Sequence, residues 1–311
     1  CNAPGADAAG TSGAKNSPQS RAARLSIAGT LQDKDIDEAS GMAWSARSDE
    51  LLWLQNDSGG KARLYAIDLA GKSRGRLKLD DVKNKDWEDL ASFVLDGEPW
   101  LLVADIGDNS SKRPHVSLYV VAEPDLAMDK KQTAKPAWTI NFSYEDGPRD
   151  AEAVAVDSER NRVLIVSKRD IPAHIYEVPL QPANDAPVVA HRLGVLTSIP
   201  QPKEEDVRFA PVTNDWHWQA TAMDIARDGS ALIVMTYGAV YYFARDSSND
   251  WATTLGKAPL AFGLKNIRNA EAAAIRADGQ QIFVSVEQKR APLLRIDLAP
   301  VNNMNNPNLA N

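Results

Sequence analysis

The chain has 311 residues, of which 25% are charged and 43% hydrophobic, the composition of an ordinary globular protein. Its 42 acidic residues outnumber its 35 basic ones, which leaves a formal net charge of −7. This charge argues against a nucleic-acid partner, which needs a basic surface, and against general attraction to an anionic membrane. No apolar run reaches 18 residues, so the sequence predicts no membrane-spanning helix.

The first 22 residues predict a flexible tether. Cys1 is the only cysteine, and residues 2–21 are rich in Ala, Gly, Ser, Asn and Pro, which cannot bury enough surface to fold. A chain that begins with Cys resembles a bacterial lipoprotein whose signal peptide has been removed, with a lipid on the Cys1 thiol. Asn2 occupies the position at which an Asp would mark retention in the inner membrane. We therefore expect the protein to be anchored in the outer membrane, on either its periplasmic or its outer side. The alternative is that the chain happens to start at this cysteine.

A three-residue phrase recurs along the remaining chain, and each copy precedes two short apolar runs and then a run with Leu-Tyr or a close equivalent. The copies begin at Glu38, Asp86, Asp150, Gln219 and Asn269. A unit of this length cannot bury its faces alone and has to stack against its neighbours. Four short strands per unit, repeated radially, predict an all-β, five-bladed β-propeller.

Apolar runs and Gly-containing or polar turns place the strands of each unit. The strands of the first unit are expected at 41–44, 51–54, 63–67 and 75–79, and those of the second begin at 90 and continue at 100–104, 116–120 and 138–142. The third unit has strands at 153–156, 163–166, 174–178 and 193–196, and the fourth at 222–225, 231–235, 240–243 and 260–262. The fifth has three, at 272–275, 281–286 and 293–296. The fifth unit lacks one strand, and residues 23–28 can supply it. The N-terminal strand is therefore expected to pair into the last blade and close the ring, which removes its open edges.

These assignments divide the chain into a lipidated tether at 1–22, one propeller domain at 23–301 and a disordered tail at 302–311. The insertion at 197–218 shows no strand pattern, so no sixth blade is expected. A β-sandwich is the rival architecture. It does not explain why four of the seven tyrosines share one repeat position, namely Tyr65, Tyr119, Tyr176 and Tyr241.

In a propeller, the start of the innermost strand and the end of the next strand lie at the same rim of the central channel, and here both positions are rich in acids. Three interpretations remain open: the acids accept hydrogen bonds that set blade spacing, they bind a hard cation, or they act in catalysis. Oxygen ligands on a Gly-bearing loop favour calcium, with the candidates Asp86, Glu88, Asp105, Asp108 and Asn109. The catalytic candidates are Glu88, Glu152 and Glu271.

Aromatic side chains are expected at the same rim. Residues 215–218 end the long insertion, and a sugar ring or a partner's side chain could stack on its aromatic residues. The candidate ligand contacts are Trp87, Trp216, His217, Trp218 and Arg169. The alternative is that these aromatic residues plug the channel or cover blade edges. The sequence contains no HExxH, GxSxG, P-loop or dinucleotide pattern.

Four phrases together resemble a group of exported bacterial propellers: residues 40–43, 86–91, 105–109 and 150–154. The group includes the SdiA-regulated family and, more distantly, the esterase-like phytase, NHL and TolB-type propellers, and the likeness covers about residues 24–298. The SdiA-regulated resemblance implies an envelope propeller without a defined reaction. The phytase-like resemblance implies phosphoester chemistry with calcium, but this chain lacks a dense basic cradle for phosphate.

The sequence thus favours an envelope-anchored lipoprotein that binds a protein or glycan partner through its acidic and aromatic rim. It would contact the membrane only through the lipid on Cys1. The alternative is a calcium-assisted hydrolase, a phosphoesterase or glycosidase, acting at the same rim.

Overall fold

A computed structural model describes residues 19–20, 24–127, 129–183, 187–245, 247–248 and 250–298. Most of the expected tether and the whole expected tail lie outside these residues, as does Cys1. Two tether residues, Gln19–Ser20, form a short strand, β1, that runs parallel to β19 (Leu260–Gly263). None of the helices in the described part of the chain has the length and apolar character needed to cross a bilayer.

The strands form five antiparallel meanders of four strands each. The first meander consists of β3 (Ala39–Trp44), β4 (Leu51–Asn56), β5 (Arg63–Asp68) and β6 (Ser73–Leu79). The second consists of β7 (Trp87–Leu95), β8 (Glu98–Asp105), β9 (Val116–Ala122) and β11 (Trp138–Tyr144). The third consists of β12 (Ala151–Asp157), β13 (Arg162–Ser167), β14 (His174–Pro179) and β15 (Val188–Val195).

The fourth meander consists of β16 (Ala220–Ile225), β17 (Ala231–Thr236), β18 (Ala239–Ala244) and β19. The fifth consists of β20 (Ala270–Ile275), β21 (Gln281–Val286), β22 (Pro292–Asp297) and, from the other end of the chain, β2 (Arg24–Thr30). Leu25 pairs with Ile296, and Ile27 pairs with Leu294. The predicted pairing of the N-terminal strand into the last meander is therefore confirmed.

Parallel pairs at the periphery were not predicted. Strand β11 pairs in parallel with β15 and joins the second and third meanders into one eight-stranded sheet. Strand β10 (Lys131–Ala134) pairs in parallel with β6. Within the described residues, three short helices complete the elements: η1 (Ser158–Arg160), α1 (Glu204–Thr213) and α2 (Trp251–Thr254). Helix α1 lies within the insertion at 197–218, where the sequence showed no strand pattern.

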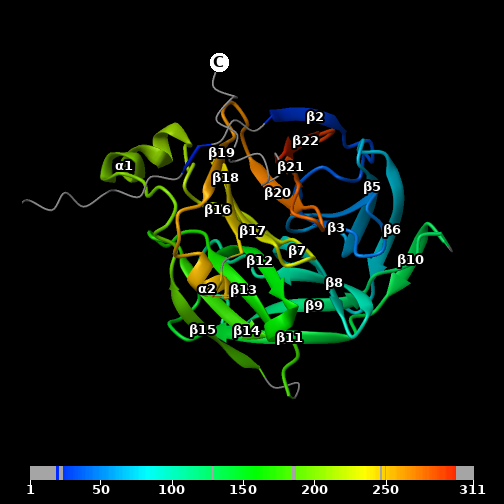
Figure 1. The fold of residues 1–311 in the computed structure, drawn as a ribbon. Helices are drawn as coiled ribbons and strands as arrows, with labels where there is room; N and C mark the ends of the chain where they lie inside the picture. The colour runs from blue at the N-terminus through cyan, green and yellow to red at the C-terminus, as the bar shows by residue number, and fades with distance from the viewer. Residues whose placement is uncertain are drawn as a thin grey trace, which may run out of the picture.

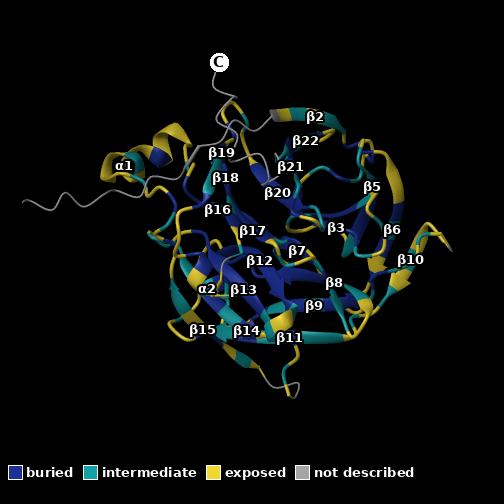
Figure 2. Cartoon of the chain, in the orientation of Figure 1, coloured by how far each residue is buried: buried dark blue, intermediate teal, exposed yellow. Residues whose placement is uncertain are grey.

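The first strands of the five meanders form a closed ring, in which β3 packs on β7, β7 on β12, β12 on β16, β16 on β20, and β20 on β3. The meanders radiate from this ring (Figure 1), and the buried residues concentrate in its strands (Figure 2). This is the arrangement of a β-propeller. Small residues let the inner strands approach closely: a Cβ at Gly41 would lie 2.8 Å from the main-chain carbon of Asp89. Apolar side chains fill the space between neighbouring meanders.

Two buried carboxylates tie the inner strands together. Asp89 of β7 accepts backbone hydrogen bonds from Val154 of β12 at 2.8 Å and from Met223 of β16 at 3.1 Å. Asp224 of β16 likewise accepts the N–H of Ile275 of β20 at 3.0 Å. Burial raises the pKa of both groups, that of Asp224 to about 8. Sequence reasoning did not single out either residue, because the partners of both lie on other inner strands far along the chain.

We expect Asp89→Ala to lower the free energy of unfolding by about 3 kcal/mol or more, because it leaves several buried N–H groups without an acceptor. Urea unfolding followed by tryptophan fluorescence measures this loss. Asp125→Ala is the matched control, since the exposed Asp125 accepts one N–H, from Ala127, and its loss should cost less than about 1 kcal/mol. Equal losses for the two variants would contradict the tie between strands.

Candidate functional site

The recurring phrase forms a β-bulge at the start of every inner strand. Register shifts at the third residue of each copy: Ser40, Glu88, Glu152, Thr221 and Glu271. A bulge sets two residues against one and re-aims a side chain, and bulges are frequent beside active sites. The structure also explains why the strands begin two or three residues earlier than predicted, since the phrase belongs to the strand.

The five bulge residues divide into two groups. Ser40 donates its hydroxyl to the carbonyl of Glu88 at 2.7 Å, and Thr221 donates to the carbonyl of Ala270 at 2.8 Å. These hydroxyls latch one inner strand to the next. The three glutamates belong instead to a cluster of charged groups in the channel. The spacing role that the sequence suggested for the acids is thus carried at these positions by the hydroxyls.

A second set of equivalent positions follows the second strand of each meander. There the backbone N–H donates to the carbonyl of the first phrase residue, at 2.8 to 3.3 Å. The residues at this position are Asp57, Gly107, Lys168, Tyr237 and Glu287. Sequence reasoning placed several of them in loops at the rim but did not select Asp57, Tyr237 or Glu287 as site residues. Their shared position in the repeat is the signal that identifies them.

Hydrogen bonds connect the two sets into a chain of titratable groups. The Lys168 ammonium contacts Glu152 and donates to the Tyr237 hydroxyl at 3.1 Å. Tyr237 donates to Glu271 at 2.5 Å, and Glu287 lies close enough to Glu271 for the two carboxyl groups to affect each other's pKa. Proton transfer along such a chain is chemically possible because every member is a donor or an acceptor.

Burial perturbs the acids of this chain. Burial raises the pKa of Glu152 to about 8, although Lys168 opposes the rise. Burial, then the neighbouring Glu271, raises the pKa of Glu287 to about 7. Burial also raises the pKa of Glu271, against the hydrogen bond from Tyr237. Acids with such pKa values can hold or release a proton near neutral pH, as general acid–base catalysis requires.

A cavity of about 670 Å³ opens above this chain of groups. It is lined by Lys168, Tyr237, Glu271 and Glu287, so a small molecule in the cavity can reach these four titratable side chains. Its walls come from the end of the long insertion and from the loop before β20. The remaining lining residues are Arg169, Thr213, Asn214, Asp215, Trp216, His217, Gln219, Asn266, Ile267, Arg268 and Asn269.

The predicted ligand contacts separate in the structure. Trp216, His217 and Arg169 line the cavity, but Trp218 is buried behind them, with its ring 5.8 Å from that of Trp216. Trp87 is fully buried in the apolar core between the first two meanders. Trp87 therefore cannot contact a ligand, because its side chain faces that core and not the channel.

The predicted metal ligands also separate. Asp105 is ion-paired with Arg113 at 2.6 Å, and Asp108 accepts the backbone N–H of Arg113 at 2.6 Å. Asn109 accepts a hydrogen bond from Arg169. Asp86 and Glu88 instead gather with Asp57, and Glu88 also gathers with Asp150 and Glu152, all three of which are outside that predicted set. Burial, then Asp57, raises the pKa of Asp86 to about 6.

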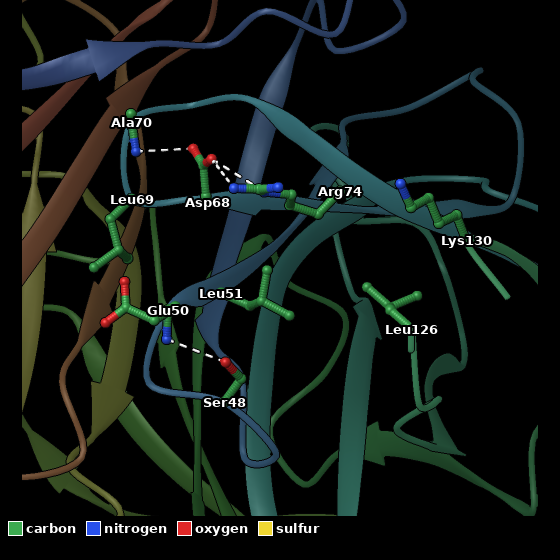
Figure 3. Close-up of a pocket in the computed structure, with 9 residues that line it drawn as sticks. All are labelled: Ser48, Glu50, Leu51, Asp68, Leu69, Ala70, Arg74, Leu126 and Lys130. Atoms are coloured by element: carbon green, nitrogen blue, oxygen red, sulfur yellow. Dashed lines mark hydrogen bonds and ion pairs between the residues drawn. The ribbon is translucent and has the colours of Figure 1, made fainter. Parts of the chain in front are cut away.

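A second depression lies at the opposite ends of the strands, beside the turns of the first meander (Figure 3). Its volume is about 700 Å³, and Leu51, Leu69 and Leu126 contribute apolar walls. Arg74 is ion-paired with Asp68 at 2.8 Å, and no chain of buried acids lies beneath it in the described residues. The rim cavity is therefore the stronger candidate site.

No protein-family model matches the sequence, and neither does any curated protein. Among solved structures, the chain is similar to a PQQ-bound aldose sugar dehydrogenase from Streptomyces coelicolor, with 9% identity, 90% of this chain and 99% of that chain covered, and a TM-score of 0.44. It is also similar to a gluconolactonase from Xanthomonas campestris, with 12% identity, coverage of 89% and 90%, and a TM-score of 0.44. A chain of a mitotic checkpoint complex matches with 12% identity, coverage of 83% and 63%, and a TM-score of 0.37. These likenesses carry no argument here, and the propeller assignment rests on the strand pairing and the inner ring.

We expect Lys168→Met to destabilise the protein more at pH 9 than at pH 6. Acids whose folded pKa is raised contribute stability at low pH and lose it as pH rises through the folded pKa. Without the ammonium, the pKa of Glu152 rises above its present value of about 8. The free energy of unfolding of the variant therefore continues to fall at pH values above those at which the wild type has stopped losing stability. Urea unfolding at the two pH values measures the difference.

Two variants control this experiment. Lys289→Met removes an exposed ammonium 3.9 Å from Asp37 and should show no such pH dependence. Adding Glu152→Gln to Lys168→Met should reduce the pH dependence, since the acid that titrates is gone. A cost of Lys168→Met that is the same at both pH values would show that Lys168 does not stabilise the channel acids.

Proposed function

We propose that the five meanders are the five blades of one propeller, joined at one place by the parallel β11–β15 pair. The closed ring of five inner strands and the β2–β22 pairing support this count. We further propose that the propeller is an envelope lipoprotein like those of the SdiA-regulated family, anchored at the outer membrane through Cys1. An experimental structure tests the blade count, and the intact mass of protein from a membrane fraction tests the lipid.

We propose that this propeller is a hydrolase that cleaves a small, neutral, hydroxyl-rich substrate at the rim cavity. The observation that carries this proposal is the set of titratable groups at the cavity floor, in which hydrogen bonds link Lys168 through Tyr237 to Glu271 and Glu287 lies beside Glu271. Buried acids with pKa values near neutrality, gathered in a pocket, mark candidate catalytic sites. This geometry reverses the order of the two functions that the sequence favoured.

The acids take complementary roles in this proposal. Glu287, with a pKa of about 7, is the general acid that protonates the leaving oxygen of the substrate. Glu271, which accepts the Tyr237 hydroxyl, is the base that takes a proton from the attacking water. The water oxygen first bonds to the ester carbonyl carbon. The bond from that carbon to the leaving oxygen then breaks, and the leaving oxygen takes the proton of Glu287, so ester and water yield a carboxylic acid and an alcohol.

The charges in the cavity favour a neutral substrate over a phosphoester. Of the three Lys and Arg side chains that line it, two are already neutralised, because Lys168 is ion-paired with Glu152 and Arg169 with Asp150. Arg268 is the third, and the lining acids Asp215, Glu271 and Glu287 offset its charge. The side-chain amides of Asn214, Asn266 and Asn269 can bond hydroxyl groups, and the ring of Trp216 can stack on a sugar. Glycosidases hold their two carboxyl groups at least about 5 Å apart, whereas Glu271 and Glu287 are immediate neighbours. We therefore propose a carboxylic ester bond as the target.

We expect Glu271→Gln and Glu287→Gln each to lower kcat/KM by about 100-fold or more, because each removes a proton-transferring group. The measurement is turnover of chromogenic carboxylic esters, with glycosides and phosphoesters for contrast. Activity should fall as pH rises through about 7, since Glu287 then loses the proton that it must donate.

Glu50→Gln is the matched control, because Glu50 lines the opposite depression (Figure 3) and should leave turnover unchanged. Wild-type protein that cleaves none of these substrates, or variants that match the wild type, would contradict the hydrolase. Cleavage confined to phosphoesters would contradict the neutral substrate.

A binding module is the second candidate, and exposed apolar side chains beside the cavity support it. On α1, Phe209 is 49% exposed and Val212 is 84% exposed, and the insertion continues to the partly buried Trp216. A protein or glycan partner from the cell envelope could cover this surface. Pull-down from envelope extract that fails with Trp216→Ala and Val212→Ser, while folding and any turnover persist, would favour this candidate over catalysis.

A further inference from the structure

Glu88 is the buried carboxylate of the channel that lacks a donor. Its residue is 4% exposed, and its carboxylate accepts no hydrogen bond and joins no ion pair with any residue that the structure describes. The other acids around it are satisfied: Glu152 by Lys168, Glu271 by Tyr237, and Asp150 by Arg169 and the N–H of Asp108. A buried carboxylate without a partner is costly, so its charge calls for a cation or a proton.

Two further carboxylates converge on Glu88. Oxygen atoms of Asp57, Asp86 and Glu88 all lie within 4.8 Å of one another. The Asp86 carboxylate also accepts no hydrogen bond from the described residues, and Asp57 accepts only the N–H of Ser58 beside it. Oxygens that share one calcium ion at about 2.3–2.6 Å lie at most about 5 Å apart, so these three can bind the same ion.

Gly107 makes the convergence possible. In the other four repeats the equivalent position carries a side chain, but a Cβ at Gly107 would lie 2.0 Å from Glu88 Oε1 and 2.6 Å from Asp86 Oδ2. The glycine thus leaves the space in which the carboxylates of Glu88 and Asp86 meet. On the far side of Glu88, Asp150 and Glu152 are already neutralised by Arg169 and Lys168. A cation therefore belongs on the side of Asp57.

We propose that Asp57, Asp86 and Glu88 bind one divalent cation of the calcium class at the channel rim. All three ligands are hard carboxylate oxygens, which suit Ca²⁺, Mg²⁺ or Mn²⁺, and water completes the coordination. This set replaces Asp105, Asp108 and Asn109 of the sequence-based hypothesis with Asp57. The site is distinct from the Glu271–Glu287 pair, so it stands whether or not the protein is a hydrolase.

The test is titration calorimetry and thermal unfolding of the full chain after chelator treatment, with CaCl₂, MgCl₂ or MnCl₂ added in separate experiments. Binding to the folded state alone raises the unfolding midpoint by mass action. We expect the wild type to bind with a stoichiometry near one and Glu88→Gln to bind about tenfold more weakly or worse. Asn109→Ala should bind as the wild type does, because Asn109 is outside the proposed set.

Glycine variants give a second readout that leaves all three carboxylates in place. Gly107→Ala should lose the cation because its methyl group occupies the meeting point of Glu88 and Asp86. Gly194→Ala is the matched control, since a Cβ there meets no atom within 4 Å, and it should bind as the wild type does. Loss of binding in both glycine variants would overturn the assignment.

Stability in chelator separates a lost ligand from a damaged fold. Without a cation, Glu88→Gln removes a buried, repelled charge, so this variant should unfold at a midpoint equal to or above that of the wild type. With cation added, the order should reverse. Wild-type protein that shows neither heat nor a midpoint shift at millimolar cation would overturn the proposal, and so would Glu88→Gln that binds as tightly as the wild type.

Discussion

The buried carboxylate of Asp89 lies where three inner strands meet, and the geometry of the channel depends on it. It belongs to β7 but accepts backbone hydrogen bonds from β12 and β16, so it fixes both strands relative to the second meander. Asp224 extends the same connection from β16 to β20. Apolar packing between meanders is non-directional. Hydrogen bonds to backbone groups are directional, so these two acids help to fix the positions from which the rim side chains project.

The bulges then decide which side chains reach the channel. The same bulge recurs in all five inner strands, but the side chains at the bulged position have two different roles. Where it is a hydroxyl, as at Ser40 and Thr221, it latches neighbouring strands. Where it is a glutamate, it joins the charged cluster. A repeat can therefore specialise by substitution at one position without a change of backbone, because the bulge is independent of the residue that occupies it.

Charge in the channel is only partly balanced by protein cations. Arg113, Arg169 and Lys168 each form an ion pair with one acid. In the described residues, Asp57, Asp86 and Glu88 have no such cation, and the neighbouring Glu271 adds to the effect of burial in raising the pKa of Glu287. Like charges at close range cannot all be ionised without compensation. The channel thus has two regions with different needs, one for a cation and one for a proton.

The repeating phrase and the apolar runs determined the meanders, their order and the closing role of residues 23–28, because each strand is marked by its own run of apolar residues between turns. They also placed an acidic rim at the channel. Only the tertiary structure decided which acids meet. Asp105 and Asp108 lie near Asp86 in the chain, but Arg113 satisfies them, whereas Asp57 arrives from another meander. Trp87 lies inside the phrase, but the bulge at Glu88 leaves it facing the core. The parallel β11–β15 pair, the Asp89 contacts and the Tyr237 bridge join residues distant in sequence, and hydrogen bonds of that kind leave no local pattern in a single chain.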